Sequence, residues 1–214
     1  MMVDLKGMTK KERIEYIWDY YKIHIIVTII VLISIISFIH GQITKTNYEF
    51  NLTIIGSSLE ADKTEKFENT LTPIVIKNPS KKQSAQLDTM PIASLTGGKE
   101  AQAPQYMQKL VAELSANVID LLILNKSDYD VFQKQGAFLK LDNAGGMDLD
   151  LIKAEKLEGT SDKGDKGIYG ISLQDNKLLK DFGVSTQDKI LCIPASTKQK
   201  DKAILAIKWI LQNN

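Results

Sequence analysis

Residues 25–39 read IIVTIIVLISIISFI, a run of fifteen positions with no charge and only three hydroxyl side chains. At about 1.5 Å of rise per helical residue, a helix of this length reaches across a hydrocarbon core of roughly 30 Å if its flanks contribute. The run is apolar on all sides and not along one stripe, which disfavours a buried helix of a soluble core. We therefore predict a transmembrane helix over residues 23–40.

Basic residues predict the orientation of this anchor. Only Lys45 follows the run closely, whereas five basic residues precede it: Lys6, Lys10, Lys11, Arg13 and Lys22. Because basic residues near a span stay on the cytoplasmic side, we expect residues 1–22 to be cytoplasmic. The predicted localisation is the cell membrane with a single pass, with residues 41–47 as an external linker and residues 48–214 as an extracellular domain.

Aromatic and polar side chains flank the span as residues of a membrane–water interface do. We assign four residues to that interface because amphipathic rings prefer the headgroup level: Trp18, Tyr20, Tyr21 and His40. Residues 9–12 (TKKE) have capping-box spacing, and the apolar positions after them recur with a helical period. Residues 1–22 are therefore expected to hold an amphipathic helix with one face toward the lipid bilayer. A cytoplasmic partner could use the same face.

A cleaved signal peptide is the alternative interpretation of the apolar run. Its length is suitable, but the segment before it is long and mixes four acids with five bases. Small residues at the −3 and −1 positions of a cleavage site are missing around residues 37–41, and no cysteine follows for lipoprotein cleavage. These features favour an uncleaved anchor.

The composition of residues 41–214 restricts the function classes. This part holds 22 of the 27 basic residues and 22 of the 26 acidic ones, and it contains neither arginine nor histidine. A neutral, arginine-free domain is a poor nucleic-acid binder, because phosphate neutralisation dominates that affinity. With no histidine for a triad and no metal-ligand spacing, we predict no enzyme, no metal and no cofactor. A surface hydrolase that uses a Ser–Lys pair is the less favoured alternative.

Two further features have a structural and a functional interpretation. Cys192, the only cysteine, lies in an apolar run, so we expect a small buried side chain and no intrachain disulfide. Asp142, Asp148 and Asp150 lack the spacing of a calcium loop, so a solvated loop is favoured over a metal site.

Apolar runs that alternate with helical patterns predict a three-layer α/β domain. Strands are expected at residues 48–55, 73–76, 118–124, 167–173 and 189–193, with a short one at 90–95. Helices are expected at residues 60–71, 104–114 and 127–135, and from residue 197 onward. The pattern dissolves over residues 77–102, where residues 97–99 (GGK) are predicted to form a turn, and residues 158–167 are predicted to be loop.

Several short motifs in residues 104–214 resemble one family. Residues 118–120 (VID) open the central strand, residues 135–142 (QGAFLKLD) follow a short helix, and residues 168–173 (IYGISL) and 196–198 (STK) come later. The type II extracellular solute-binding proteins have a "PDV" strand, a "G-x-L-x-P-L-D" turn, a "YGIPL" strand and an "SKN" segment in this order. Lys140 stands where that turn has proline. Residues 16–22 (YIWDYYK) also look like small anchored surface proteins of Gram-positive bacteria.

The resemblance implies one lobe of a periplasmic-binding-protein-like fold. Family members close two lobes on a ligand, whereas here residues 142–167 leave only loop where the second lobe would be. Ligand contacts would then lie at the carboxyl ends of two strands, at Gly56, Ser57 and Ser58 and at Asn125 and Lys126. The alternative is that these residues are only caps and turns.

Three functions are thus weighed. The favoured one is a membrane-anchored extracellular binding or scaffolding module that resembles a reduced solute-binding protein. It would be accessory to a transporter or receptor subunit that supplies the missing lobe, or would bind a small molecule. A membrane-complex assembly subunit would instead act through the span, where Thr28, Ser34 and Ser37 could pack against another helix. The surface hydrolase is third.

Overall fold

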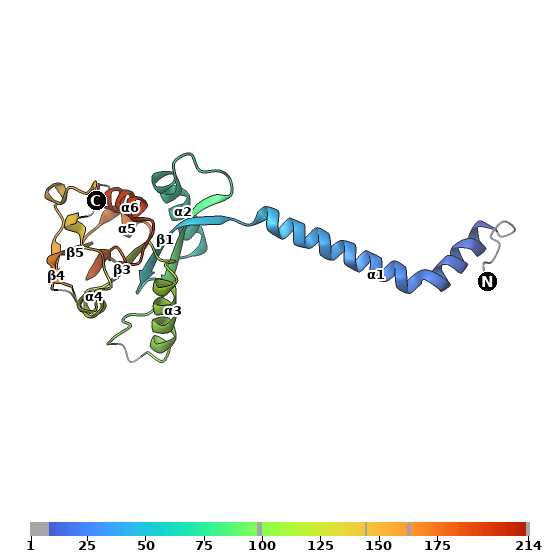
Figure 1. The fold of residues 1–214 in the computed structure, drawn as a ribbon, viewed down its shortest axis with the longest axis horizontal. Helices are drawn as coiled ribbons and strands as arrows, with labels where there is room; N and C mark the ends of the chain where they lie inside the picture. Colours follow the sequence, from blue (N-terminus) through green and yellow to red (C-terminus); the bar gives the residue numbers. More distant parts are fainter. Residues whose placement is uncertain (1–8, 98–99, 144, 162–163, 213–214) are drawn as a thin grey trace. The chain divides into compact units, whose positions relative to one another are not determined.

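The computed structural model describes residues 9–97, 100–143, 145–161 and 164–212 (Figure 1). Predictions for residues 1–8, for positions 98–99 of the GGK turn and for positions 162–163 of the loop lie outside the described residues. The chain divides into two compact units, Met1–Lys45 and Thr46–Asn214.

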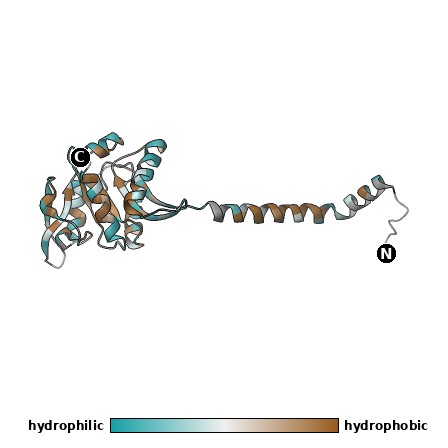
Figure 2. Cartoon of the chain, turned by 90° about the horizontal axis from the view of Figure 1, so that it is seen from above, coloured by the Kyte–Doolittle hydropathy of each residue, from teal (hydrophilic) through white to brown (hydrophobic). Residues whose placement is uncertain are grey.

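The first unit is the helix α1, which runs without interruption over Lys10–Thr44. The expected amphipathic segment and the expected span therefore belong to one helix, which also includes residues 41–44 of the predicted linker. Within α1, Tyr21–His40 is long and apolar enough to cross a membrane, and none of it is buried (Figure 2). Among the described residues, this stretch is the one candidate membrane span by length and composition.

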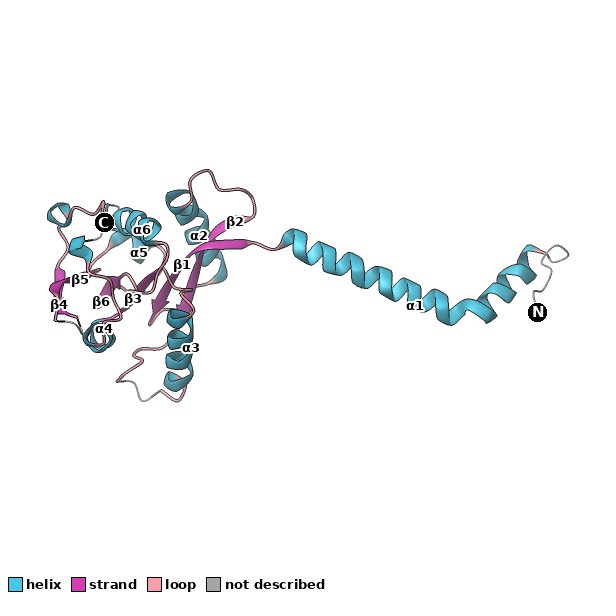
Figure 3. Ribbon diagram, in the orientation of Figure 1, coloured by secondary structure: helices cyan, strands magenta, loops and turns pink. Residues whose placement is uncertain are grey.

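The second unit is built on one six-stranded mixed sheet of order β2-β1-β3-β6-β5-β4 (Figure 3). Strand β1 pairs in parallel with β2 and β3, and the pairs β3–β6, β6–β5 and β5–β4 are antiparallel. The strands span Asn47–Ile55 (β1), Gln83–Met90 (β2), Leu121–Asn125 (β3), Lys156–Thr160 (β4), Lys166–Ser172 (β5) and Lys189–Cys192 (β6).

Helices cover both faces of this sheet. They span Ala61–Val75 (α2), Ala103–Ser115 (α3), Lys126–Lys134 (α4), Lys177–Asp181 (α5) and Lys200–Gln212 (α6). Along β3, Leu121 and Ile123 pack in a cluster with residues of α2, α5 and α6, whereas Leu122 and Leu124 pack in a second cluster with α3 and α4. Successive strand residues point to opposite faces, so a continuous apolar run is what a strand buried on both faces requires. The mixed α/β class is confirmed.

The predicted strand at residues 73–76 is wrong, because α2 continues through Pro73 to Val75. Val75 lies one helical turn after Leu71 and two turns after Phe67, and all three side chains are buried. Burial of this stripe outweighs the one backbone hydrogen bond that proline removes near the helix end.

A polar strand, β2, replaces the predicted short strand at residues 90–95, of which only Met90 is in a strand. It lies at one edge of the sheet, so only part of it is buried. Side chains of α2 cover its backbone: Thr72 Oγ1 accepts from Ala85 N at 3.0 Å and Glu68 Oε1 accepts from Leu87 N at 2.8 Å. These contacts occupy donors that an edge strand would otherwise offer to another chain.

The predicted loop over residues 158–167 is partly wrong as well. Strand β4 extends to Thr160, and β5 already begins at Lys166, so the two strands form an antiparallel pair. The outer strand β4 is only partly buried and carries two charged residues, so it has no apolar run from which it could be predicted. The short helix α5 was also not predicted.

Candidate functional site

The ends of β1 and β3 meet at one edge of the sheet, as expected for the candidate ligand residues. The two strands are parallel, and Gly56 follows β1 with a left-handed φ of 79°. A Cβ atom at Gly56 would lie 3.5 Å from Nδ2 of Asn125, the last residue of β3. Because glycine has no side chain, the chain can turn at Gly56 and the ends of β1 and β3 can lie close together.

A buried lysine lies at the same edge. Lys189 begins β6 and pairs across the antiparallel ladder with Asn125. Only 3% of Lys189 is exposed, and its ammonium Nζ donates to the carbonyl oxygen of Ile55. A Cβ atom at Gly56 would collide with this ammonium, so glycine is what makes room for it. Gly56, Asn125 and Lys189 therefore form one polar cluster, which we call the carboxyl-edge cluster.

Asp128, in the first turn of α4, is a buried acid whose charge acts on Lys189. It is fully buried and accepts four hydrogen bonds, from Ser94 Oγ (2.9 Å), Leu95 N (3.0 Å), Thr96 N (3.0 Å) and Thr96 Oγ1 (2.6 Å). Burial lowers the pKa of Lys189 to about 8, although the charge of Asp128 acts in the opposite direction. The lysine is thus a cation at neutral pH that loses its proton more readily than a surface lysine.

The five predicted ligand residues separate into two groups. Gly56 and Asn125 belong to the carboxyl-edge cluster, and Ser57 is 8% exposed with a buried Oγ that has no hydrogen-bond partner among the described residues. Ser58 and Lys126 are exposed, and Lys126 forms an ion pair with Asp130 at 3.3 Å. A buried hydroxyl without a hydrogen bond costs free energy. Among the five predicted ligand residues, Ser57 would therefore gain most from a hydrogen bond to a polar ligand.

Sequence reasoning named neither Lys189 nor Asp128 as a candidate site residue. Nothing in the local pattern around residue 189 distinguishes it from a surface lysine before a strand. Its place in the cluster depends on β6 running antiparallel to β3, which puts the start of β6 beside the end of β3. That pairing is a long-range property of the sheet.

The residue that carries the family resemblance in the central strand has a structural role at the opposite end of that strand. Asp120 is buried, and its carboxylate accepts from Asn51 N at 2.9 Å and from Thr197 Oγ1 at 2.8 Å. Burial raises the pKa of Asp120, and these two donors partly offset that effect. Asp120 thus links β1 to the segment that leads into α6.

Cys192 is completely buried in β6, as predicted, and its thiol lies 3.5 Å from the carbonyl oxygen of Leu122. Burial raises the pKa of this thiol, which disfavours the reactive thiolate. Within the described ranges, no group of three or more His, Cys, Asp or Glu side chains could hold a metal ion.

The predicted interface residues lie along α1. Trp18 is 54% exposed, and Tyr21 is exposed one turn later, where its ring meets that of His24 edge-on at 6.2 Å. His40 is exposed at the other end of the apolar stretch, and the side chain of Tyr20 lies outside the described part of the helix.

Comparisons with protein-family models, curated proteins and solved structures found no match to this chain.

Proposed function

We propose that the chain is a single-pass membrane protein whose unit Thr46–Asn214 is a binding or scaffolding module on the outer face of the membrane. The observation that carries this proposal is the apolar stretch Tyr21–His40, which is long enough to cross a membrane and of which no part is buried among the described residues. An apolar helix of this length that is not buried requires an apolar environment of its own. The basic residues before the span support a cytoplasmic N-terminus.

The carboxyl-edge cluster supports a binding role for the domain. In open α/β sheets, ligands bind outside the carboxyl ends of parallel strands. Here that edge combines a buried cation, an amide and the Ser57 hydroxyl, which is hydrogen-bonded to no base among the described residues. We therefore favour recognition of a polar ligand or partner group over catalysis. The likeness to one lobe of a type II solute-binding protein is part of the same proposal.

The alternative function, an assembly subunit that acts through its span, has weaker support. Thr28 Oγ1 donates to the carbonyl oxygen of His24 and Ser34 Oγ donates to that of Ile30, both at 2.8 Å. The donor of each hydroxyl is therefore satisfied within α1 and does not need a neighbouring helix.

One experiment separates the two functions. The full-length protein is crosslinked in its native membrane, purified and compared with a variant in which residues 23–40 are replaced by an unrelated transmembrane sequence. A tethered module should recover the same partner, a transporter or receptor subunit, from both proteins. Loss of the partner only from the exchanged variant would assign the function to the span and contradict our proposal.

A further inference from the structure

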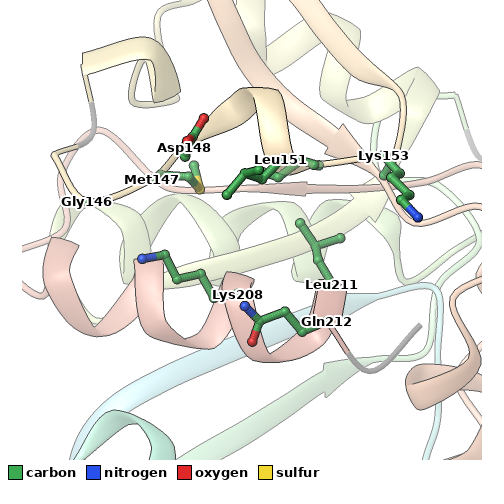
Figure 4. Close-up of a pocket in the computed structure, with 10 residues that line it drawn as sticks. Gly146, Met147, Asp148, Leu151, Lys153, Lys208, Leu211 and Gln212 are labelled. Carbon is green, nitrogen blue, oxygen red and sulfur yellow. The ribbon is translucent and has the colours of Figure 1, made fainter.

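A cavity of about 480 Å³ lies between the segment 146–154 and the end of α6, and no residue of the carboxyl-edge cluster lines it. Its volume is within the range of small-molecule sites. Apolar and polar residues of both segments line it, with the apolar side chains of Leu151 and Leu211 on opposite sides (Figure 4). Every residue that lines it belongs to the unit Thr46–Asn214, so the inference below does not depend on the membrane topology.

The most exposed large apolar side chain of the whole described chain lies at this cavity. Leu151, at the end of a single 3-10 turn over Leu149–Leu151, is 78% exposed. In such a turn, residues three apart share a face, so Leu149 and Ile152 both pack against the core and leave Leu151 outside. Asp148 holds the turn by accepting from Asp150 N at 3.1 Å. An apolar ligand in the cavity would cover Leu151.

Two lysines give the cavity a positive charge. Lys208 on α6 is half-buried, and Lys153 is exposed at the other end of the cavity (Figure 4). Neither ammonium has an ion-pair partner within the described part of the chain. The one acid in the lining, Asp148, is the residue that holds the 3-10 turn. A half-buried ammonium without an ion-pair partner, beside the apolar side chains of Leu151 and Leu211, complements a ligand that has an anionic head and a hydrocarbon chain.

We propose that this cavity binds a free single-chain carboxylate of the fatty-acid class. The carboxylate pairs with Lys208, the chain lies between Leu151 and Leu211, and Lys153 adds a weaker attraction because it is more exposed. Charge complementarity selects this ligand over a neutral or cationic amphiphile of equal length.

The test uses the full-length protein in lipid nanodiscs and a dodecanoate analogue with a photoreactive diazirine near its chain end. Adducts are located by mass spectrometry of peptides, with unmodified dodecanoate as competitor and the matching dodecanol analogue as a neutral probe. Lys208→Met should lower labelling about tenfold, which is the effect of losing one charge-assisted hydrogen bond. Lys153→Met should have a smaller effect. Lys134→Met, which removes an exposed lysine from α4, is the matched control.

The proposal requires adducts on the peptides that contain Leu151 or Leu211, competition by dodecanoate and weaker labelling by the neutral probe. Leu151→Asn gives a second test, since so exposed a side chain can change with little effect on folding, and it should also reduce labelling. Adducts found only in α1, or equal labelling of Lys208→Met and Lys134→Met in proteins with the same thermal unfolding, would overturn the proposal.

Discussion

The buried ammonium of Lys189 should make the stability of the domain depend on pH in a defined direction. The pKa of this lysine falls from 10.5 to about 8 on folding because burial disfavours the charged form. Between these two values the unfolded chain binds more protons than the folded domain, so raising the pH stabilises the fold. The free-energy cost of burying the charged Lys189 side chain is present in full below about pH 8 and disappears above about pH 10.5.

The size of this effect follows from the same two pKa values. At pH 7 the buried charge costs ~3 kcal/mol, and ~1.4 kcal/mol of that cost disappears between about pH 6 and pH 9. Lys189→Met removes the titration but also leaves the Ile55 carbonyl without its donor, at a cost of about 1–3 kcal/mol. We therefore expect the variant to lie within about 2 kcal/mol of the wild type at pH 7, and the wild type to gain ~1.4 kcal/mol relative to it by pH 9.

Urea unfolding of residues 45–214 at several pH values measures this difference. All other ionisable groups are the same in both proteins, so their contributions cancel when the two curves are subtracted. Lys126→Met, which removes an exposed lysine from the same edge, controls for the loss of a surface charge. Parallel stability curves for the wild type and Lys189→Met over pH 6–9 would refute the reasoning.

Three other substitutions or modifications test the carboxyl-edge cluster and the core. Gly56→Ala should destabilise the domain by about 1–3 kcal/mol in urea unfolding and by more than Gly164→Ala. Both glycines have positive φ, but of the two only Gly56 lies against another side chain, that of Lys189. An equal loss of stability in both variants would exclude the contact with Lys189. Asp128→Asn should cost about 2–3 kcal/mol through lost hydrogen bonds to residues 94–96, whereas Asp130→Asn, which breaks a surface ion pair, should cost less than about 1 kcal/mol; a similar small loss in both variants would contradict the role of Asp128. The Cys192 thiol should react with maleimide only in denaturant, because burial raises its pKa and blocks access; rapid labelling of the folded protein would show that β6 opens.

Continuous apolar runs made the central strands predictable. The predicted strands at residues 118–124 and 189–193 overlap β3 and β6, which are buried on both faces and are therefore apolar at every position except Asn125 and Lys189 at the shared edge. Strand β2, at the edge of the sheet, lacks such a run. Its buried residues Ala85 and Leu87 are separated by polar residues that are only partly buried. Its place in the sheet depends on pairing with β1, which no local pattern contains.

The same distinction applies to the candidate site. Gly56 and Asn125 could be predicted because parallel strands end at one edge, and the order of elements indicates which strands are parallel. Lys189 lies at that edge only because β6 runs antiparallel to β3. Asp128 is buried under the loop at residues 94–96, whose backbone amides donate hydrogen bonds to its carboxylate. Both depend on contacts between segments more than thirty residues apart.

The central claim is that a membrane span separates the N-terminus from the domain Thr46–Asn214. Because Cys192 is buried, single cysteines introduced at exposed positions can be labelled selectively. Suitable variants are Lys11→Cys, in the first turn of α1, and Ser58→Cys, in the domain. We predict that a membrane-impermeant maleimide added to intact cells labels Ser58→Cys at once and labels Lys11→Cys only after the membrane is permeabilised. Protection of Ser58→Cys in intact cells, or recovery of the wild-type protein in the soluble fraction, would contradict our interpretation.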